Sequence, residues 1–100
     1  MRKITQDAIS AFMSGTYFQR DNTGVLNLHT KTNLYLHGNL IAVRDNISGK
    51  IQISNANWFS NTTKERLNGI PGVRINQKKG VWYLNGNEWC GSWITIKEGV

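Results

Sequence analysis

The chain has 100 residues, with 12 Lys and Arg against 6 Asp and Glu, and a formal net charge of +6. This length suffices for one hydrophobic core, so we expect a single domain over residues 1–100. The one cysteine excludes an intrachain disulfide and suits a reducing compartment, and with two histidines it falls short of the four ligands of a structural zinc site. No apolar run approaches the roughly 20 residues that span a bilayer, and the basic N-terminus lacks the apolar stretch of a signal peptide. We therefore expect a cytoplasmic protein without membrane contact.

The first predicted element is a short helix over residues 6–14. Thr5 is a suitable N-cap, and Gly15 is a suitable residue to follow the last turn. Between them an apolar face recurs at helical spacing, which comprises Ala8, Ile9, Phe12 and Met13. A helix this short is marginal in isolation, so we expect its apolar face to pack on another element.

An antiparallel meander is predicted next. After a polar, turn-rich stretch over 16–24, short strands are expected over 25–29, 33–37, 40–44 and 50–54. The two-residue turn between the second and third strands is assigned to Gly38 and Asn39. Ile51 and Ile53 share one face of the last strand, and the N-terminal helix is the expected cover for that side of the sheet.

A second short helix and a second meander complete the predicted elements. Thr62 and Glu65 have the spacing of a capping box, and Gly69 fits the helix end. We expect this helix to be anchored on the sheet by Trp58, Phe59 and Leu67. Strands follow over 73–77, 81–84 and 89–96; turns are predicted at 78–80 and 85–86, and Gly91 is expected at a bulge or close approach.

These elements predict an α+β protein: a short N-terminal helix and a second short helix packed on antiparallel β-meanders of about six strands. Val81 and Tyr83 should face one side of their strand, and Trp82 and Leu84 the other. Alternation leaves open whether the meanders form one curved sheet or two layers. An edge strand could pair with a second copy, which leaves a homodimer open.

The sequence shows no pattern that supports catalysis. The six carboxylates are scattered among caps and turns rather than paired for acid–base work, and neither a P-loop nor a dinucleotide fingerprint is present. Cys90, between Trp89 and Gly91, is interpreted as a small buried hydrophobic residue. We therefore expect a protein that is not an enzyme, with no catalytic residues, no metal and no cofactor.

The remaining signal is a local excess of positive charge near aromatic residues. Residues 64–79 hold five cations against Glu65, a net charge of +4. Cations contact phosphate and flat rings stack on bases, so this mixture is typical of nucleic-acid and nucleotide binding. The predicted phosphate-binding residues are Lys64, Arg66, Arg74, Lys78 and Lys79, and the predicted stacking residues are Trp58, Tyr83 and Trp89. A bland interpretation stays open: the charge keeps a small domain soluble, and half of the rings or more are structural.

Three segments of the chain, 34–39, 60–69 and 82–86, with Trp93 beyond them, resemble small uncharacterised proteins of tailed bacteriophages. The resemblance covers about residues 4–96 and implies binding rather than catalysis. We therefore expect a non-enzymatic phage accessory protein that binds nucleic acid or a nucleotide through the basic helix-to-hairpin segment. The alternative is an effector that binds a host protein, such as an antiviral-defence factor, through the same Trp, Tyr and Arg patch.

Overall fold

The computed structural model describes residues 1–96 as two helices and nine strands, and all strand pairs are antiparallel. This confirms the predicted α+β class, with more strands than expected. The elements are α1 (Lys3–Ser14), β1 (Phe18–Arg20), β2 (Thr23–Asn27), β3 (Lys31–Leu36), β4 (Asn39–Asp45), β5 (Ile51–Ile53), α2 (Asn61–Asn68), β6 (Ile75–Lys78), β7 (Val81–Leu84), β8 (Asn87–Glu88) and β9 (Ile94–Ile96).

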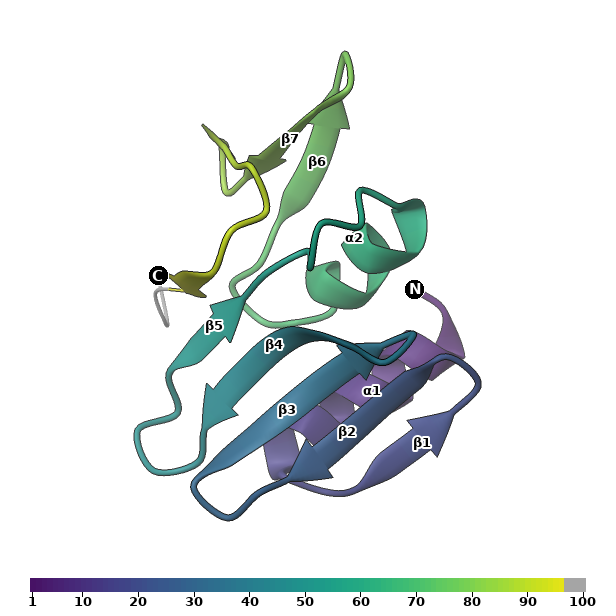
Figure 1. Cartoon of the computed structure of the whole chain (residues 1–100), viewed down its shortest axis with the longest axis vertical. Coiled ribbons are helices and arrows are strands. Elements are labelled where there is room, and N and C mark those ends of the chain that lie inside the picture. The colour runs from purple at the N-terminus through teal and green to yellow at the C-terminus, as the bar shows by residue number, and fades with distance from the viewer. Residues whose placement is uncertain (97–100) are drawn as a thin grey trace.

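The larger sheet has the order β1-β2-β3-β4-β5-β9, and α1 covers one of its faces (Figure 1). Alternate residues of β2 and β3 point toward α1, so Val25 and Leu34 are fully buried against Phe12. This confirms the prediction that the N-terminal helix covers one face of the first meander. No described helix lies over the opposite face, which is the one turned toward the viewer in Figure 1.

The helix α1 begins earlier than predicted. Arg2 is its N-cap and makes no side-chain capping hydrogen bond, whereas Thr5 lies inside the helix and is fully buried. The Thr5 hydroxyl donates to Glu65 Oε1 at 2.5 Å, so a partner 60 residues away satisfies the group that the sequence suggested as a cap. The predicted end is confirmed, because Gly15 is left-handed and its N–H donates to the Ala11 carbonyl.

Two predictions for the first meander are wrong in detail. The polar stretch 16–24 contains the edge strand β1, which pairs with β2. The β3–β4 turn is His37-Gly38 rather than Gly38-Asn39: both turn residues have positive φ, 51° and 78°, as a tight hairpin turn requires. Glycine and asparagine are the stronger turn signals in a sequence, so Gly38-Asn39 was selected and the turn was misplaced by one residue.

The helix α2 is capped by Ser60, not by Thr62. The Ser60 Oγ accepts from the Thr63 N–H at 3.1 Å, and the Glu65 carboxylate turns away toward α1. Gly69 follows the helix as predicted but is not left-handed. A Cβ at Gly69 would lie 2.7 Å from Ile9 Cγ1, so glycine there allows α1 and α2 to pack closely.

The second meander forms a separate sheet, β6-β7-β8, which answers the question that alternation left open. Its turns are Lys79-Gly80 and the predicted Asn85-Gly86, each with positive φ at both residues. The predicted strand 89–96 is too long: β8 ends before it, at Glu88, and only its last three residues form a strand, β9, which pairs with β5 in the larger sheet. Trp82 and Leu84 lie on one face of β7, as predicted; this face is the buried one, and the core continues from α1 beneath α2 to these side chains.

Candidate nucleic-acid interface

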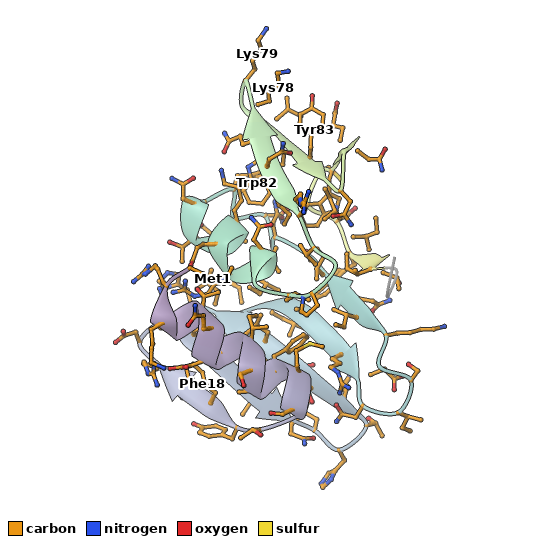
Figure 2. The ribbon with its side chains drawn as sticks, turned by 180° about the vertical axis from the view of Figure 1, so that it is seen from behind. Met1, Phe18, Lys78, Lys79, Trp82 and Tyr83 are labelled. Atoms are coloured by element: carbon orange, nitrogen blue, oxygen red, sulfur yellow. The ribbon has the colours of Figure 1, made fainter. Side chains whose placement is uncertain are left out.

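The β6–β7 hairpin projects from the rest of the molecule and carries lysines at its tip (Figure 2). Lys78 ends β6, Lys79 occupies the turn with φ of 53°, and both side chains are exposed. Arg74 is also exposed and precedes β6 at the base of the hairpin, where its N–H donates to Asn85 Oδ1. Three of the five predicted phosphate-binding residues therefore lie along one projecting ribbon.

The two faces of this hairpin have different surroundings. Gln77 is paired with Trp82 on the face toward α2, and Asn76 is paired with Tyr83 on the other face. Directly opposed residues of an antiparallel pair share a face, so Tyr83 shares its face with Lys78, two residues from Asn76. Tyr83 is half-buried. The outward face of the hairpin thus combines the ring of Tyr83, the amide of Asn76 and the cation of Lys78.

Lys64 reaches the hairpin from α2. Its Nζ donates to Gln77 Oε1 at 2.5 Å and lies 5.6 Å from the centroid of the Trp82 ring. Both contacts are attractive, because an amide oxygen and the face of an indole both attract a cation. Lys64 is half-buried and places a positive charge beside the Gln77–Trp82 pair of the hairpin.

Arg66 is not available for a phosphate, contrary to the sequence-based expectation. It is 1% exposed, and its Nε donates to Thr23 Oγ1 at 3.0 Å. Its Nη1 donates to Thr5 Oγ1 at 2.7 Å and forms an ion pair with Glu65. These partners belong to α1, β2 and α2. Arg66 therefore stabilises the junction of three elements, and no local pattern in the sequence reveals partners so distant.

Glu65 completes this junction. Partial burial opposes its ionisation, but hydrogen bonds from the Thr5 hydroxyl and the Arg2 N–H, together with the Arg66 charge, lower the pKa of Glu65 below its ordinary value. The carboxylate is thus held in its ionised form beside a buried guanidinium, which is the arrangement that makes a buried cation tolerable.

The three predicted stacking residues differ in exposure. Trp89 is buried at 6% exposure; its ring lies 6.3 Å from that of Trp82 and its Nε1 donates to the Ser92 carbonyl. This corrects its assignment as a stacking residue, since a base cannot reach the ring. Trp58 is 59% exposed and Phe59 is 58% exposed, so the expectation that they anchor α2 is also wrong. Leu67, fully buried, is the anchor.

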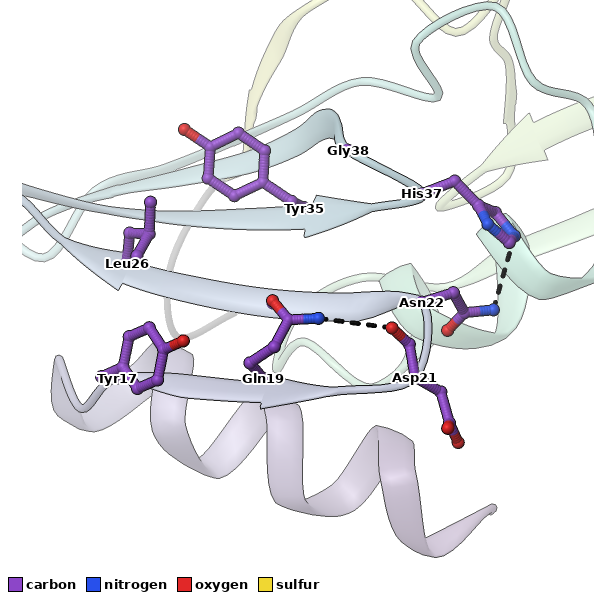
Figure 3. A pocket seen from close by; sticks show the side chains of 9 residues that line it. Tyr17, Gln19, Asp21, Asn22, Leu26, Tyr35, His37 and Gly38 are labelled. Carbon is purple, nitrogen blue, oxygen red and sulfur yellow. Dashed lines mark hydrogen bonds between the residues drawn. The ribbon is translucent and has the colours of Figure 1, made fainter.

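A groove of about 580 Å³ lies on the open face of the six-stranded sheet (Figure 3). Gly24 forms part of its floor, and Tyr17, Leu26 and Tyr35 stand around it. Neither lysine nor arginine lines the groove, whereas the acidic Asp21 does. The groove therefore lacks the cations that phosphate needs, and sequence reasoning did not select any of its residues.

Cys90 is exposed, which corrects its interpretation as a buried hydrophobic residue. A hydrogen bond between its Sγ and Ser92 Oγ lowers the pKa of the thiol below its ordinary value. Among residues 1–96, no three His, Cys, Asp or Glu side chains are grouped to hold a metal ion. Neither described helix is long and apolar enough to cross a membrane.

The fold and this surface define a small α+β protein that bears a projecting, basic β-hairpin. Residues 1–97 match the family model described as Kyanoviridae Gp96 protein, and the chain belongs to that family. This membership confirms the resemblance to small proteins of tailed phages. Neither a curated protein nor a solved structure matches the chain.

Proposed function

We propose that this phage protein is a non-enzymatic accessory protein that binds nucleic acid through the β6–β7 hairpin, in the cytoplasm of the host cell. The observation that carries the proposal is the placement of Lys78 and Lys79, exposed together at the tip of a projecting two-stranded ribbon (Figure 2). Lysines that contact phosphates release counterions, and this release supplies much of the affinity for nucleic acids.

A polynucleotide fits this surface better than a single nucleotide. The cations Arg74, Lys78 and Lys79 are distributed along a convex ribbon, so each can contact a different phosphate of one strand. A single nucleotide needs a concave site where cations converge. The groove beside β1 and β2 is concave but contains no cation, and a second concavity on the same face, of about 350 Å³, sets the acidic Asp45 beside Lys31 and Lys50. We therefore propose a chain of phosphates as the ligand.

Charge reversal at the tip tests this proposal. The double variant Lys78→Glu/Lys79→Glu should bind a fluorescein-labelled oligonucleotide on the order of tenfold more weakly or worse, because two phosphate contacts become repulsive. The matched control is Lys31→Glu/Lys50→Glu, which makes the same change in net charge at two exposed positions, one that begins β3 and one that directly precedes β5. Equal weakening by both variants would show a general charge effect and contradict a specific role for the hairpin.

A second candidate function is binding of a host protein. Trp93 precedes β9 and Ile94 begins it, and they are 47% and 41% exposed; β9 is an edge strand of the larger sheet. Exposed tryptophan and an unpaired strand edge both favour protein contacts. A stoichiometric host protein retained from nuclease-treated lysate by the wild type, and lost with Trp93→Ala, would support this function. Retention of that protein unchanged by Trp93→Ala would argue against a protein contact through Trp93 and β9.

A further inference from the structure

The segment over residues 54–60, here called the aromatic loop, connects β5 to α2 and exposes two large rings in succession. Trp58 and Phe59 are 59% and 58% exposed. A single exposed apolar side chain is ordinary on a protein surface, but a contiguous pair of large rings indicates a contact surface. Neither side chain is fully used in the core, so their presence calls for another explanation.

The backbone of the aromatic loop is held in an unfavourable conformation. Ala56 and Asn57 are both left-handed, with φ of 53° and 66°. A Cβ atom disfavours this region, and alanine has no polar side chain to compensate locally. Such conformations persist only where the surroundings impose them, and they are concentrated at functional sites.

Buried contacts impose this conformation. Asn55 is fully buried, its Oδ1 accepts from the Asn57 N–H at 2.8 Å, and its carbonyl accepts from the Trp58 N–H at 2.8 Å. The Gly91 carbonyl accepts from the Asn55 N–H at 3.0 Å and from the Ser54 hydroxyl at 2.8 Å. A Cβ at Gly91 would lie 2.2 Å from the Asn55 side chain. The hydrogen bonds and close packing of these buried groups therefore fix the conformation of the aromatic loop, which exposes its two rings.

A pocket of about 230 Å³ adjoins Trp58, which forms one of its walls. Leu36 and Ile41 are buried and give it apolar surface. His37, Asn39 and Thr62 add groups that can form hydrogen bonds. A flat ring with polar edges suits this combination: it could stack on the indole while its edge meets the amide, imidazole or hydroxyl group.

On its other side, the aromatic loop meets the basic hairpin. The Phe59 ring lies edge-on to Trp82 with centroids 5.2 Å apart, and Lys64 lies over the same Trp82 ring. Rings and cations are thus contiguous from Trp58 to the Gln77–Trp82 pair of β6–β7. A ligand that spans this surface must offer flat polar rings on a backbone of negative charge, and this is the chemistry of a nucleic acid.

We infer that the aromatic loop and its adjoining pocket bind unpaired bases of single-stranded nucleic acid, whose phosphates contact Lys64 and the hairpin. The inference rests on the proposed function and specifies its ligand. Exposed rings can stack only on bases that are free of a duplex, because paired bases are already stacked on their neighbours. Single strands should therefore bind more tightly than the duplex of the same sequence.

Fluorescence anisotropy with labelled strands of about 12 nucleotides tests the inference. Trp58→Ala should weaken single-strand binding about 5- to 100-fold, as expected for loss of one stacked base. The dependence of affinity on salt should stay unchanged, because no phosphate contact is removed. Tyr17→Ala is the control: it removes a ring that is 66% exposed beside β1, and affinity should not change.

Phe59→Ala provides a second variant, with its melting temperature measured because the ring also contacts Trp82. Unchanged single-strand affinity in Trp58→Ala, or tighter binding to duplex than to single strand, overturns the inference. If Lys78→Glu/Lys79→Glu weakens binding while Trp58→Ala does not, only the inference fails and the proposed function stands. If no polynucleotide binds the wild type, both fail, and a protein partner becomes the better explanation of the exposed rings.

Discussion

The helix-backed sheet and the C-terminal hairpin differ in what their side chains contact. In the larger sheet, alternate residues of the central strands are buried against α1, and Val25 and Leu34 have no exposed surface. In the β6–β7 hairpin, Ile75, Trp82 and Leu84 are buried, whereas Lys78 through Gly80 are exposed. Burial against α1 explains the residue types of the larger sheet. The hairpin instead carries exposed cations that contribute nothing to the core, and we therefore place the proposed binding surface there.

Removal of the Arg66 side chain should give the largest effect. Arg66→Ala leaves the Glu65 carboxylate and the hydroxyls of Thr5 and Thr23 without their shared partner, so it should lower the free energy of unfolding by about 3 to 5 kcal/mol. Arg74→Ala, at the base of the hairpin, should change it by about 0.5 kcal/mol or less. Urea denaturation followed by circular dichroism measures both. Similar losses of unfolding free energy in the two variants would contradict the role of Arg66 in joining α1, β2 and α2.

Two glycines with similar backbone conformations offer a matched comparison. Gly91 has φ of 93° and contacts Asn55, whereas Gly80 has φ of 80° and no atom lies within 4 Å of the point that its Cβ would occupy. Gly80→Ala should cost about 1 kcal/mol of unfolding free energy, which reflects the backbone alone. Gly91→Ala should cost about 2 to 4 kcal/mol, because a steric overlap is added. Equal costs would mean that the aromatic loop does not depend on this close approach.

Relief of backbone strain in the aromatic loop should stabilise the protein. Ala56→Gly should raise the free energy of unfolding by about 0.5 to 1 kcal/mol, because glycine adopts positive φ without a steric penalty. The same substitution at Ala11, inside α1, should instead lower it by about 1 kcal/mol or more. Thermal denaturation of the two variants distinguishes these opposite signs. A loss of stability in Ala56→Gly would contradict a strained loop.

The acid dependence of stability should reflect Glu65. Its pKa is lower in the folded protein than its ordinary value of 4.5, so its contribution to stability is complete above about pH 4.5 and is lost as the pH falls through the folded-state pKa. Glu65→Gln removes this titrating group and should flatten the decline of unfolding free energy in that acidic range. An unchanged pH profile in Glu65→Gln would show that other carboxylates, such as Asp7 and Asp45, account for the decline.

Local chemistry predicted much of the fold. Gly15 marked the end of α1, Asn85-Gly86 marked a tight turn, and alternation separated the faces of β5 and β7. The edge strand β1 was missed because three residues in a polar stretch give too short a pattern. The N-cap of α2 was misassigned because Ser60 and Thr62 are both capable caps, and the carboxylate that suggested Thr62 binds a distant partner.

The candidate site was harder to predict because burial is decided by tertiary contacts. Lys78 and Lys79 are exposed at a turn, as their position beside Gly80 suggested. Arg66 and Trp89 have residue types suited to binding, yet their partners fix them in the interior. Trp58 was selected, but the left-handed Ala56 and Asn57 that position it have no sequence signature. Composition therefore predicted that basic and aromatic side chains are exposed, but it did not predict correctly which of them are.

The most direct test of hairpin binding is the slope of log Kd against log salt concentration for a single-stranded oligonucleotide. We predict a steep slope for the wild type and a slope smaller in magnitude by about 1 to 2 for Lys78→Ala/Lys79→Ala, since each lysine that contacts a phosphate contributes about 0.7 to 0.9. Lys31→Ala/Lys50→Ala should keep the wild-type slope. A flat dependence in the wild type, or equal slopes in all three proteins, would contradict the account.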